Sequence, residues 1–138
     1  MAMTVHVDVV SPESILYSGL AEMVVAPTKM GEVGITPRHA PLLAIMKPGD
    51  VKIKKPGGVV EHYYVSGGVL EVLPHLVTIL SDTCIRAHDL NEAKALEAKR
   101  NAERIIERKN TSRQIAIAEI KLMEAVAQLR IIEKTRKR

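Results

Sequence analysis

The sequence predicts an α+β fold, in which an antiparallel β-sandwich over residues 1–87 is followed by a two-helix antiparallel hairpin over residues 88–138. The main observation is that all 8 glycines and all 7 prolines lie at or before Pro74. Because Gly and Pro form turns and interrupt helices, the first part suits a structure of many turns and the second suits nearly continuous helix. Period-two alternation in the first part and a heptad-like spacing in the second support the same division.

Short alternating segments define the strands of the sandwich. Val5, Val7 and Val9 alternate with polar residues, which is the pattern of a half-buried strand, and Val51 and Ile53 repeat it. Further strands are expected at Met23–Ala26, Val59–Val65, Val69–Leu73 and Leu76–Leu80, separated by turn residues such as those at 48–50, 56–58 and 66–68. Many short strands at close spacing indicate an antiparallel sandwich or barrel.

One segment of the first part lacks this alternation. Two glycines and two prolines between Gly31 and Leu43 predict an irregular loop that holds Glu32, Arg38 and His39 between apolar residues. The residues alone leave two interpretations open. The segment is either a simple crossing between sheets or a rigid loop that presents polar side chains to a partner.

Two capping patterns predict the helices of the second part. Asp89 and Glu92 have capping-box spacing before the first helix, and Thr111 and Gln114 repeat it before the second. A stripe of mostly small residues on the first helix faces a heptad-like seam on the second, which favours an αα-hairpin with helices about 28 and 35 Å long. The stripe is Ala95, Ala98, Ala102 and Ile105, and the seam is Ile115, Ala118, Leu122, Ala125, Leu129 and Ile132. A further apolar set on the second helix is expected to pack on the β domain or on a partner: Ile117, Ile120, Met123, Val126 and Ile131.

Charge is divided unequally between the two parts. Residues 1–85 carry 6 basic and 8 acidic side chains, and residues 86–138 carry 14 and 8, so the helical part is basic. Arg100, Arg104 and Arg108 follow one another at four-residue spacing, which places three like charges on one helix face. This face is either simply solvated, with glutamates nearby, or paired with an acidic partner.

The sequence lacks the patterns of an enzyme. It contains no phosphate-binding loop, no G-x-S-x-G segment and no metal-ligand spacing among its 5 histidines and the lone Cys84, which favours a non-enzyme without a cofactor. With only 3 tyrosines and no Phe or Trp, the chain is a poor candidate for stacking nucleic-acid bases. An adaptor is therefore favoured over a nucleic-acid-binding module or a small enzyme. No apolar stretch approaches the length of about 20 residues that membrane insertion requires.

Four segments carry a resemblance to a known family. They are MAMTVHVDVVSPE at the start, GEVGITPRHAPLLA, YYVSGGVLEV and, near the end, AVAQLRIIEKT. Together the chain resembles the epsilon subunit of bacterial F-type ATP synthase over essentially all 138 residues. The resemblance implies a β-sandwich followed by two helices. It also implies a non-catalytic central-stalk (rotor) subunit of the proton-translocating enzyme, placed peripherally at the cytoplasmic face of the inner membrane.

The same resemblance implies partners and candidate residues. The sandwich would bind the gamma subunit and the c-ring, with Glu32 and His39 as the c-ring contacts. The hairpin would be mobile and would inhibit ATP hydrolysis by reaching the acidic DELSEED segment of a catalytic beta subunit. The basic residues that would make this contact are Arg100, Arg104, Arg108, Lys121 and Arg130.

One departure from the family concerns nucleotide binding. Some relatives bind ATP through a motif of the form I/L-D-x-x-R-A, whereas this chain has Leu90, Asn91, Lys94 and Ala95 at the defined positions. Asn lacks the carboxylate charge, and Lys cannot reproduce the bidentate geometry of a guanidinium. Weak or absent ATP binding is therefore expected.

Overall fold

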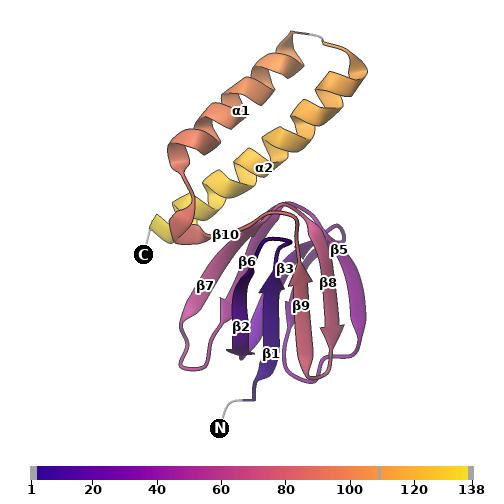
Figure 1. Cartoon of the computed structure of the whole chain (residues 1–138), viewed down its shortest axis with the longest axis vertical. Coiled ribbons are helices and arrows are strands. Elements are labelled where there is room, and N and C mark those ends of the chain that lie inside the picture. The colour runs from indigo at the N-terminus through magenta and orange to yellow at the C-terminus, as the bar shows by residue number, and fades with distance from the viewer. Residues whose placement is uncertain (1–2, 109, 137–138) are drawn as a thin grey trace.

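The computed structural model describes residues 3–108 and 110–136 as a β-sandwich with a helical hairpin docked at one end (Figure 1). The strands are β1 (Val5–Val10), β2 (Ile15–Ala21), β3 (Met23–Thr28), β4 (Gly31–Ile35), β5 (Leu42–Met46), β6 (Gly49–Lys54), β7 (Val60–Val65), β8 (Gly68–Leu73), β9 (Leu76–Leu80) and β10 (Cys84–Arg86). A 3-10 turn, η1 (Ala87–Asp89), leads to helices α1 (Glu92–Glu107) and α2 (Ser112–Arg136). The predicted α+β class is confirmed. In the described ranges, neither helix is long and apolar enough to span a membrane.

The strands form one nearly closed sheet that folds into two layers. Their order is β10-β7-β6-β3-β5-β8-β9-β1-β2, with β4 added beside β3. A single bridge between Thr28 and Met46 joins β3 to β5, and the sheet turns there from one layer to the other. All described pairs are antiparallel except β1 with β9, which run parallel in the register of His6 with Leu76. This parallel pair departs from the expected sandwich, and the long connection between the two strands permits it.

The alternating residues of the strands build the core. Val5, Val7 and Val9 point inward, as do Val51 and Ile53, and all five are buried. The core cluster is confined to strand residues and contains no residue of either helix. The sandwich therefore builds its main core from its own apolar faces, without a contribution from the hairpin.

The segment expected as a long loop is mostly strand. Residues 31–35 form β4 against β3, and residues 42–46 form β5 against β8, so only residues 36–41 remain irregular. Gly31 has a φ of 117°, which lets the chain reverse tightly after Thr28 and return as a strand. The Gly content of this segment therefore marks a hairpin turn rather than an extended irregular loop.

One of the two predicted helix caps is wrong and the other is confirmed. Helix α1 is capped by Asn91, whose side-chain oxygen accepts a 3.1 Å hydrogen bond from the Lys94 amide. Asp89 instead ends the 3-10 turn, because the extended backbone at Leu90 and Asn91 separates it from α1. Thr111 and Gln114 exchange the two hydrogen bonds of a capping box before α2, each 3.3 Å long.

The helices meet along alanines. Ala95 and Ala102 of α1 are buried, as are Ala118 and Ala125 of α2, so the predicted small-residue seam forms. Its remaining α1 positions, Ala98 and Ile105, stay exposed because a groove opens between the helices toward their tip. The additional apolar face predicted for α2 is used in part. Ile131 packs on Tyr64 of β7 together with Ala127, and Val126 is partly buried beside Lys47 and Pro48. Ile117, Ile120 and Met123 are exposed.

Candidate partner-binding surfaces

A basic groove runs between the outer halves of the two helices. It has a volume of about 630 Å³, and its cations are Arg104 and Arg108 from α1 and Lys121 from α2. None of the described residues that line it is acidic, and exposed Ile105 and Ile117 form part of its wall. We call this surface the basic groove. An unneutralised cationic groove with apolar walls is suited to an acidic amphipathic segment.

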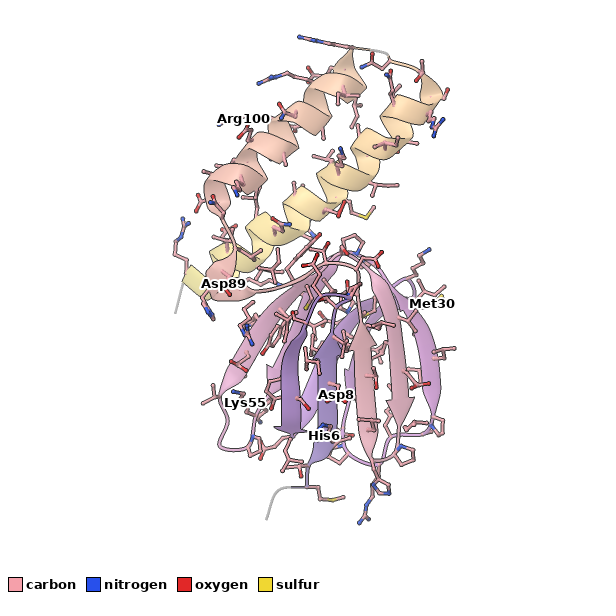
Figure 2. The ribbon with its side chains drawn as sticks, viewed as in Figure 1. His6, Asp8, Met30, Lys55, Asp89 and Arg100 are labelled. Carbon is pink, nitrogen blue, oxygen red and sulfur yellow. The ribbon has the colours of Figure 1, made fainter. Side chains whose placement is uncertain are left out.

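The other two predicted basic contacts lie elsewhere. Arg100 is exposed on α1, one turn before Arg104, and lines a smaller surface recess with Leu96 and Glu97 (Figure 2). Arg130 lies on α2 beside Lys47 and Pro48 of the β5–β6 turn, close to the sandwich. The structure thus brings Arg104, Arg108 and Lys121 together and leaves Arg130 apart. In the described part of the chain, no carboxylate lies within ion-pair distance of any of the five.

An apolar strip lies on the outer face of the layer formed by β5, β8 and β9, where Glu71 lies opposite Leu43. Ile45 of β5 lies opposite Val69 of β8, which lies opposite Leu80 of β9, and Leu43 extends the row along β5. All four side chains are exposed, Leu43 most of all at 71%. We call this surface the apolar strip. Neighbouring exposed apolar side chains on one sheet face mark a surface that a partner covers.

The two predicted c-ring residues lie at opposite ends of β4. Glu32 follows the β3–β4 turn, is exposed and forms a 3.8 Å ion pair with Lys52. His39 lies beyond the other end of β4, where the Arg38 amide binds the Pro74 carbonyl of the β8–β9 turn. The ring of His39 donates through Nδ1 to the Ala40 carbonyl at 2.6 Å. The structure therefore does not bring Glu32 and His39 into one site.

The degenerate nucleotide motif has structural roles in this chain. Leu90 packs with the cluster that joins hairpin to sandwich, Asn91 caps α1, and Ala95 is buried in the helix seam. Beside them, a recess of about 280 Å³ holds Lys94 and Lys121 but also the carboxylate of Glu124. The Asn91 oxygen is engaged by the helix end, and the motif contributes no guanidinium for a phosphate.

A Ser-His-Asp cluster on β1 and β2 is not arranged for catalysis. His6 Nε2 lies 2.9 Å from Asp8 Oδ1 and 3.2 Å from Ser18 Oγ, and Ser18 donates to Asp8 at 2.7 Å (Figure 2). In a hydrolytic triad the two imidazole nitrogens divide these tasks, and the serine donates to the histidine. Here one nitrogen faces both partners and the serine proton lies toward the carboxylate, so nothing activates the hydroxyl.

The joint between hairpin and sandwich is small and mixes apolar with ionisable groups. Ala127 and Ile131 pack on Tyr64, with Ile85, Ala87 and Leu90 at the edge. The Tyr64 hydroxyl is buried beside Glu124 and Gln128 without a well-formed hydrogen bond to either, and burial raises the pKa of Tyr64 above its usual value. On the same sheet face, His62 Nδ1 lies 2.9 Å from Asp50 Oδ2. The joint therefore contains an ionisable pair that the sequence pattern did not single out.

One signal in the sequence could have located the apolar strip. The run Leu42-Leu43-Ala44-Ile45-Met46 is apolar at every position, which in a strand means that both faces are covered. Met46 is buried in the sandwich core, whereas Leu43 and Ile45 are exposed and available to a partner. No comparable local signal marks Asp50 and His62, because they are 12 residues apart in the chain.

Comparison with known families gives two matches that together span nearly all of the chain. Residues 4–87 match the ATP synthase delta/epsilon chain β-sandwich domain, and residues 88–133 match the long α-helix domain of the same chain. The ATP synthase epsilon chain of Nitrosococcus oceani is 50% identical over 138 residues, covering 100% of this chain and 99% of the relative. ATP synthase epsilon chain 1 of Methylococcus capsulatus is 55% identical over 137 residues, covering 99% and 98%.

Two solved structures share the fold at low sequence identity. A chain of the Euglena gracilis mitochondrial ATP synthase (OSCP/F1/c-ring) superposes with a TM-score of 0.83 at 18% identity, over 92% of this chain and 80% of that one. A chain of the Tetrahymena thermophila mitochondrial ATP synthase central stalk/c-ring gives 0.62 at 13% identity, over 94% and 97%. These likenesses establish the two-part architecture.

Proposed function

The chain belongs to the ATP synthase delta/epsilon-chain family, as a non-catalytic stalk subunit of the epsilon type, and from this premise we propose that it couples the catalytic head to the c-ring and restrains ATP hydrolysis through its hairpin. The observation that carries the proposal is the independence of the two parts. The sandwich has its own core, and only a small cluster around Tyr64 holds the hairpin to it. Release of the hairpin therefore leaves the sandwich folded.

The basic groove supports an inhibitory contact with the acidic segment of a catalytic beta subunit. Arg104, Arg108 and Lys121 converge on it without an acidic neighbour in its described lining. Bringing a carboxylate-rich segment to this groove relieves repulsion between the cations and adds attraction. Arg100 extends the same face of α1, whereas Arg130 contributes only when α2 leaves the sandwich.

The apolar strip supports the contact with the gamma subunit. Leu43, Ile45, Val69 and Leu80 lie on strands rather than on loops, so they form a rigid surface. Covering such a surface stabilises an assembly by about 25 cal/mol for each Å² of apolar area removed from water. A lasting interface within the rotor fits this surface better than a transient encounter.

The β3–β4 turn is the stronger candidate for the c-ring contact. Met30 at this turn is 96% exposed (Figure 2). Glu32 follows it as the second residue of β4. His39 lies beyond the other end of β4, so a ring contact through His39 would be separate from the contact at the β3–β4 turn. In this arrangement the chain is a peripheral component at the cytoplasmic face of the bacterial inner membrane, within a proton-translocating complex.

The experiment that tests the proposal is a titration of ATP hydrolysis by the matching epsilon-free catalytic head. Full-length chain and residues 1–87 are added in parallel, and their binding to the head is measured independently. We expect both to bind and only the full chain to inhibit. Equal inhibition by the two chains assigns the effect to the sandwich and contradicts an inhibitory hairpin. If both chains bind and neither inhibits, the proposed restraint of ATP hydrolysis is contradicted, and the proposed coupling of the head to the c-ring still stands.

A further inference from the structure

One stripe of α2 is longer than the sandwich surface that it covers. Ile131 packs on Tyr64 of β7 and is buried. The positions seven and fourteen residues earlier lie on nearly the same side of the helix, and they hold Glu124 and Ile117. Ile120 lies beside Ile117, one turn along the helix. The outer part of α2 rises away from the sandwich, so the sandwich does not cover this end of the stripe (Figure 1).

The uncovered end of the stripe exposes large apolar side chains. Ile117 is 47% exposed, Ile120 59% and Met123 53%. A surface helix normally carries polar residues on the side that meets water, whereas α2 has apolar residues toward α1, toward the sandwich and on this third side. Three neighbouring large apolar side chains on one helix face indicate a surface that another molecule covers.

Opposite charges flank the two isoleucines of this face. Arg113 lies one turn before Ile117, and Glu124 lies one turn after Ile120. Arg113 is exposed, Glu124 is partly buried, and neither forms an ion pair with any residue in the ranges 3–108 and 110–136. From the tip inward, the order is a cation, two isoleucines and an anion. This order is complementary to itself when two copies of the helix run antiparallel.

An antiparallel pair of α2 helices brings these groups together around a two-fold axis. When the axis passes between positions 118 and 119, Ile117 of each copy faces Ile120 of the other. In the same register, Arg113 of each copy faces Glu124 of the other, so the ion pair occurs twice. Helices packed in this way lie about 8–10 Å apart, which lets the isoleucines interdigitate. The contact then has an apolar centre and a charged rim, as protein interfaces usually do.

We propose that two copies of the free chain associate through this face, as an isologous dimer of α2 helices centred on Ile117 and Ile120. The contact covers few residues, so the association is weak, with a Kd of about 10–100 µM expected for an interface at the small end of the usual range. Ile117 also forms a wall of the basic groove, so the dimer hides part of that groove. The dimer is therefore a form of the unassembled chain. It forms with the hairpin docked and does not require the proposed release.

Sedimentation equilibrium of the full chain measures this association, with a reducing agent present so that Cys84 forms no disulfide. Between about 1 and 300 µM, the mass should rise from 15.2 kDa toward twice that value. Ile120→Glu is expected to raise the Kd by about tenfold or more, because it places a charge at the centre of the contact. Ile105→Glu is the matched control. It makes the same change at an exposed isoleucine of α1, outside the proposed contact, and should leave the Kd unchanged.

A reciprocal exchange of charges tests the register. Arg113→Glu and Glu124→Arg each place like charges face to face, and each should raise the Kd by about fivefold or more. The double variant restores opposite charges in the reverse order, so its Kd should return to within about threefold of the original value. Arg113 and Glu124 are about three turns apart in one helix, so this recovery can arise only between copies. Circular dichroism checks that the helices persist in every variant.

The outcomes decide between the dimer and other occupants of the face. A chain that stays monomeric up to about 300 µM overturns the proposal. Association that Ile120→Glu leaves unchanged, or that the double variant fails to recover, assigns the contact to another surface and also overturns it. If the chain stays monomeric and Ile120→Glu instead weakens binding to the epsilon-free head, the face belongs to a partner in the assembly. Because the dimer keeps the hairpin docked, each of these results leaves the proposed inhibition to its own test.

Discussion

Arg86 at the end of β10 donates a hydrogen bond through Nη2 to the backbone carbonyl of Leu16 on β2, 70 residues earlier in the chain. These strands are the two ends of the strand order, so the bond links the free edges of a sheet that hydrogen bonds between neighbouring strands do not close. Arg86 also lies beside the Tyr63 hydroxyl, which donates to Glu61 at 3.1 Å. A single guanidinium thus ties together β2, β7 and β10 below the hairpin.

Replacing this guanidinium should loosen the sandwich. Arg86→Ala is expected to lower the free energy of unfolding by about 1–3 kcal/mol, because it leaves the Leu16 carbonyl without its charged donor. Urea unfolding followed by circular dichroism measures the change. Arg100→Ala, which removes an exposed arginine outside the sandwich, should leave the midpoint unchanged. Equal midpoints for Arg86→Ala and the unmodified chain would show that the edges are held by packing alone.

Gly68 is required by the close approach of β9. Its φ is 113°, and a Cβ at this position would lie 2.0 Å from the Leu80 carbonyl oxygen. Gly68→Ala should therefore destabilise the sandwich by about 3 kcal/mol or more, since it combines backbone strain with a backbone clash. Gly58→Ala is the matched control, because Gly58 also has a positive φ but no atom within 4 Å of the added Cβ. If both variants unfold at the same urea concentration, backbone strain at positive φ, and not the clash with Leu80, explains the need for glycine at position 68.

Two isoleucines of α2, Ile131 and Ile120, provide a matched test of the contact between hairpin and sandwich. Ile131 is 1% exposed against Tyr64, whereas Ile120 is 59% exposed. Ile131→Ala should weaken hairpin docking by about 2–4 kcal/mol, the usual cost of truncating a buried isoleucine, without lowering sandwich stability. Faster proteolytic cleavage between residues 87 and 92 reports the release. The Ile120→Ala variant should be cleaved at the same rate as the unmodified chain. If both variants are cleaved faster to the same extent, the docking contact lies elsewhere.

Charge reversal in the basic groove should relieve inhibition. Arg104→Glu combined with Arg108→Glu is expected to raise the concentration for half-maximal inhibition of ATP hydrolysis by about tenfold or more, because like charges then oppose an acidic partner. The control, Lys99→Glu on α1 with Arg113→Glu on α2, makes the same charge change on the hairpin outside the groove. Binding of the sandwich to the head should stay constant in both. A similar loss of inhibition in the control variant would show that the effect comes from the net charge of the hairpin and not from the groove.

The lowered pKa of Asp8 predicts that part of the stability of the sandwich is lost in acid. The hydrogen bond from Ser18, together with the hydrogen bond and charge of His6, outweighs partial burial and holds the pKa of Asp8 below its ordinary value of 3.8. A depressed carboxylate pKa contributes stability that is present above pH 3.8 and lost as the pH falls through the folded-state value. Asp8→Asn should therefore flatten the stability profile below pH 4, as measured by urea unfolding. Asp82→Asn, which changes an exposed aspartate without a described hydrogen bond, should leave the profile unchanged, and identical profiles for all three chains would contradict the assignment.

Local patterns predicted part of the candidate surfaces. The four-residue spacing of Arg104 and Arg108 is enough to place both on one exposed helix face. Lys121 joins them only because α2 returns antiparallel to α1 and the pair opens near its tip. In the same way, Glu32 and His39 are near neighbours in the sequence, yet a strand of the sheet holds them apart.

By itself, the sequence determined where strands give way to helices, because turn residues, a period of two and a heptad-like spacing act over a few residues. It also determined the small-residue seam and the Thr111–Gln114 cap, which are local for the same reason. Only the tertiary structure decided that β1 pairs in parallel with β9, that Ile131 rather than Ile120 is covered, and that Asp50 meets His62 beneath α2. These relationships depend on which distant surfaces pack together, and the free energy of that choice is spread over the whole core rather than carried by any short segment.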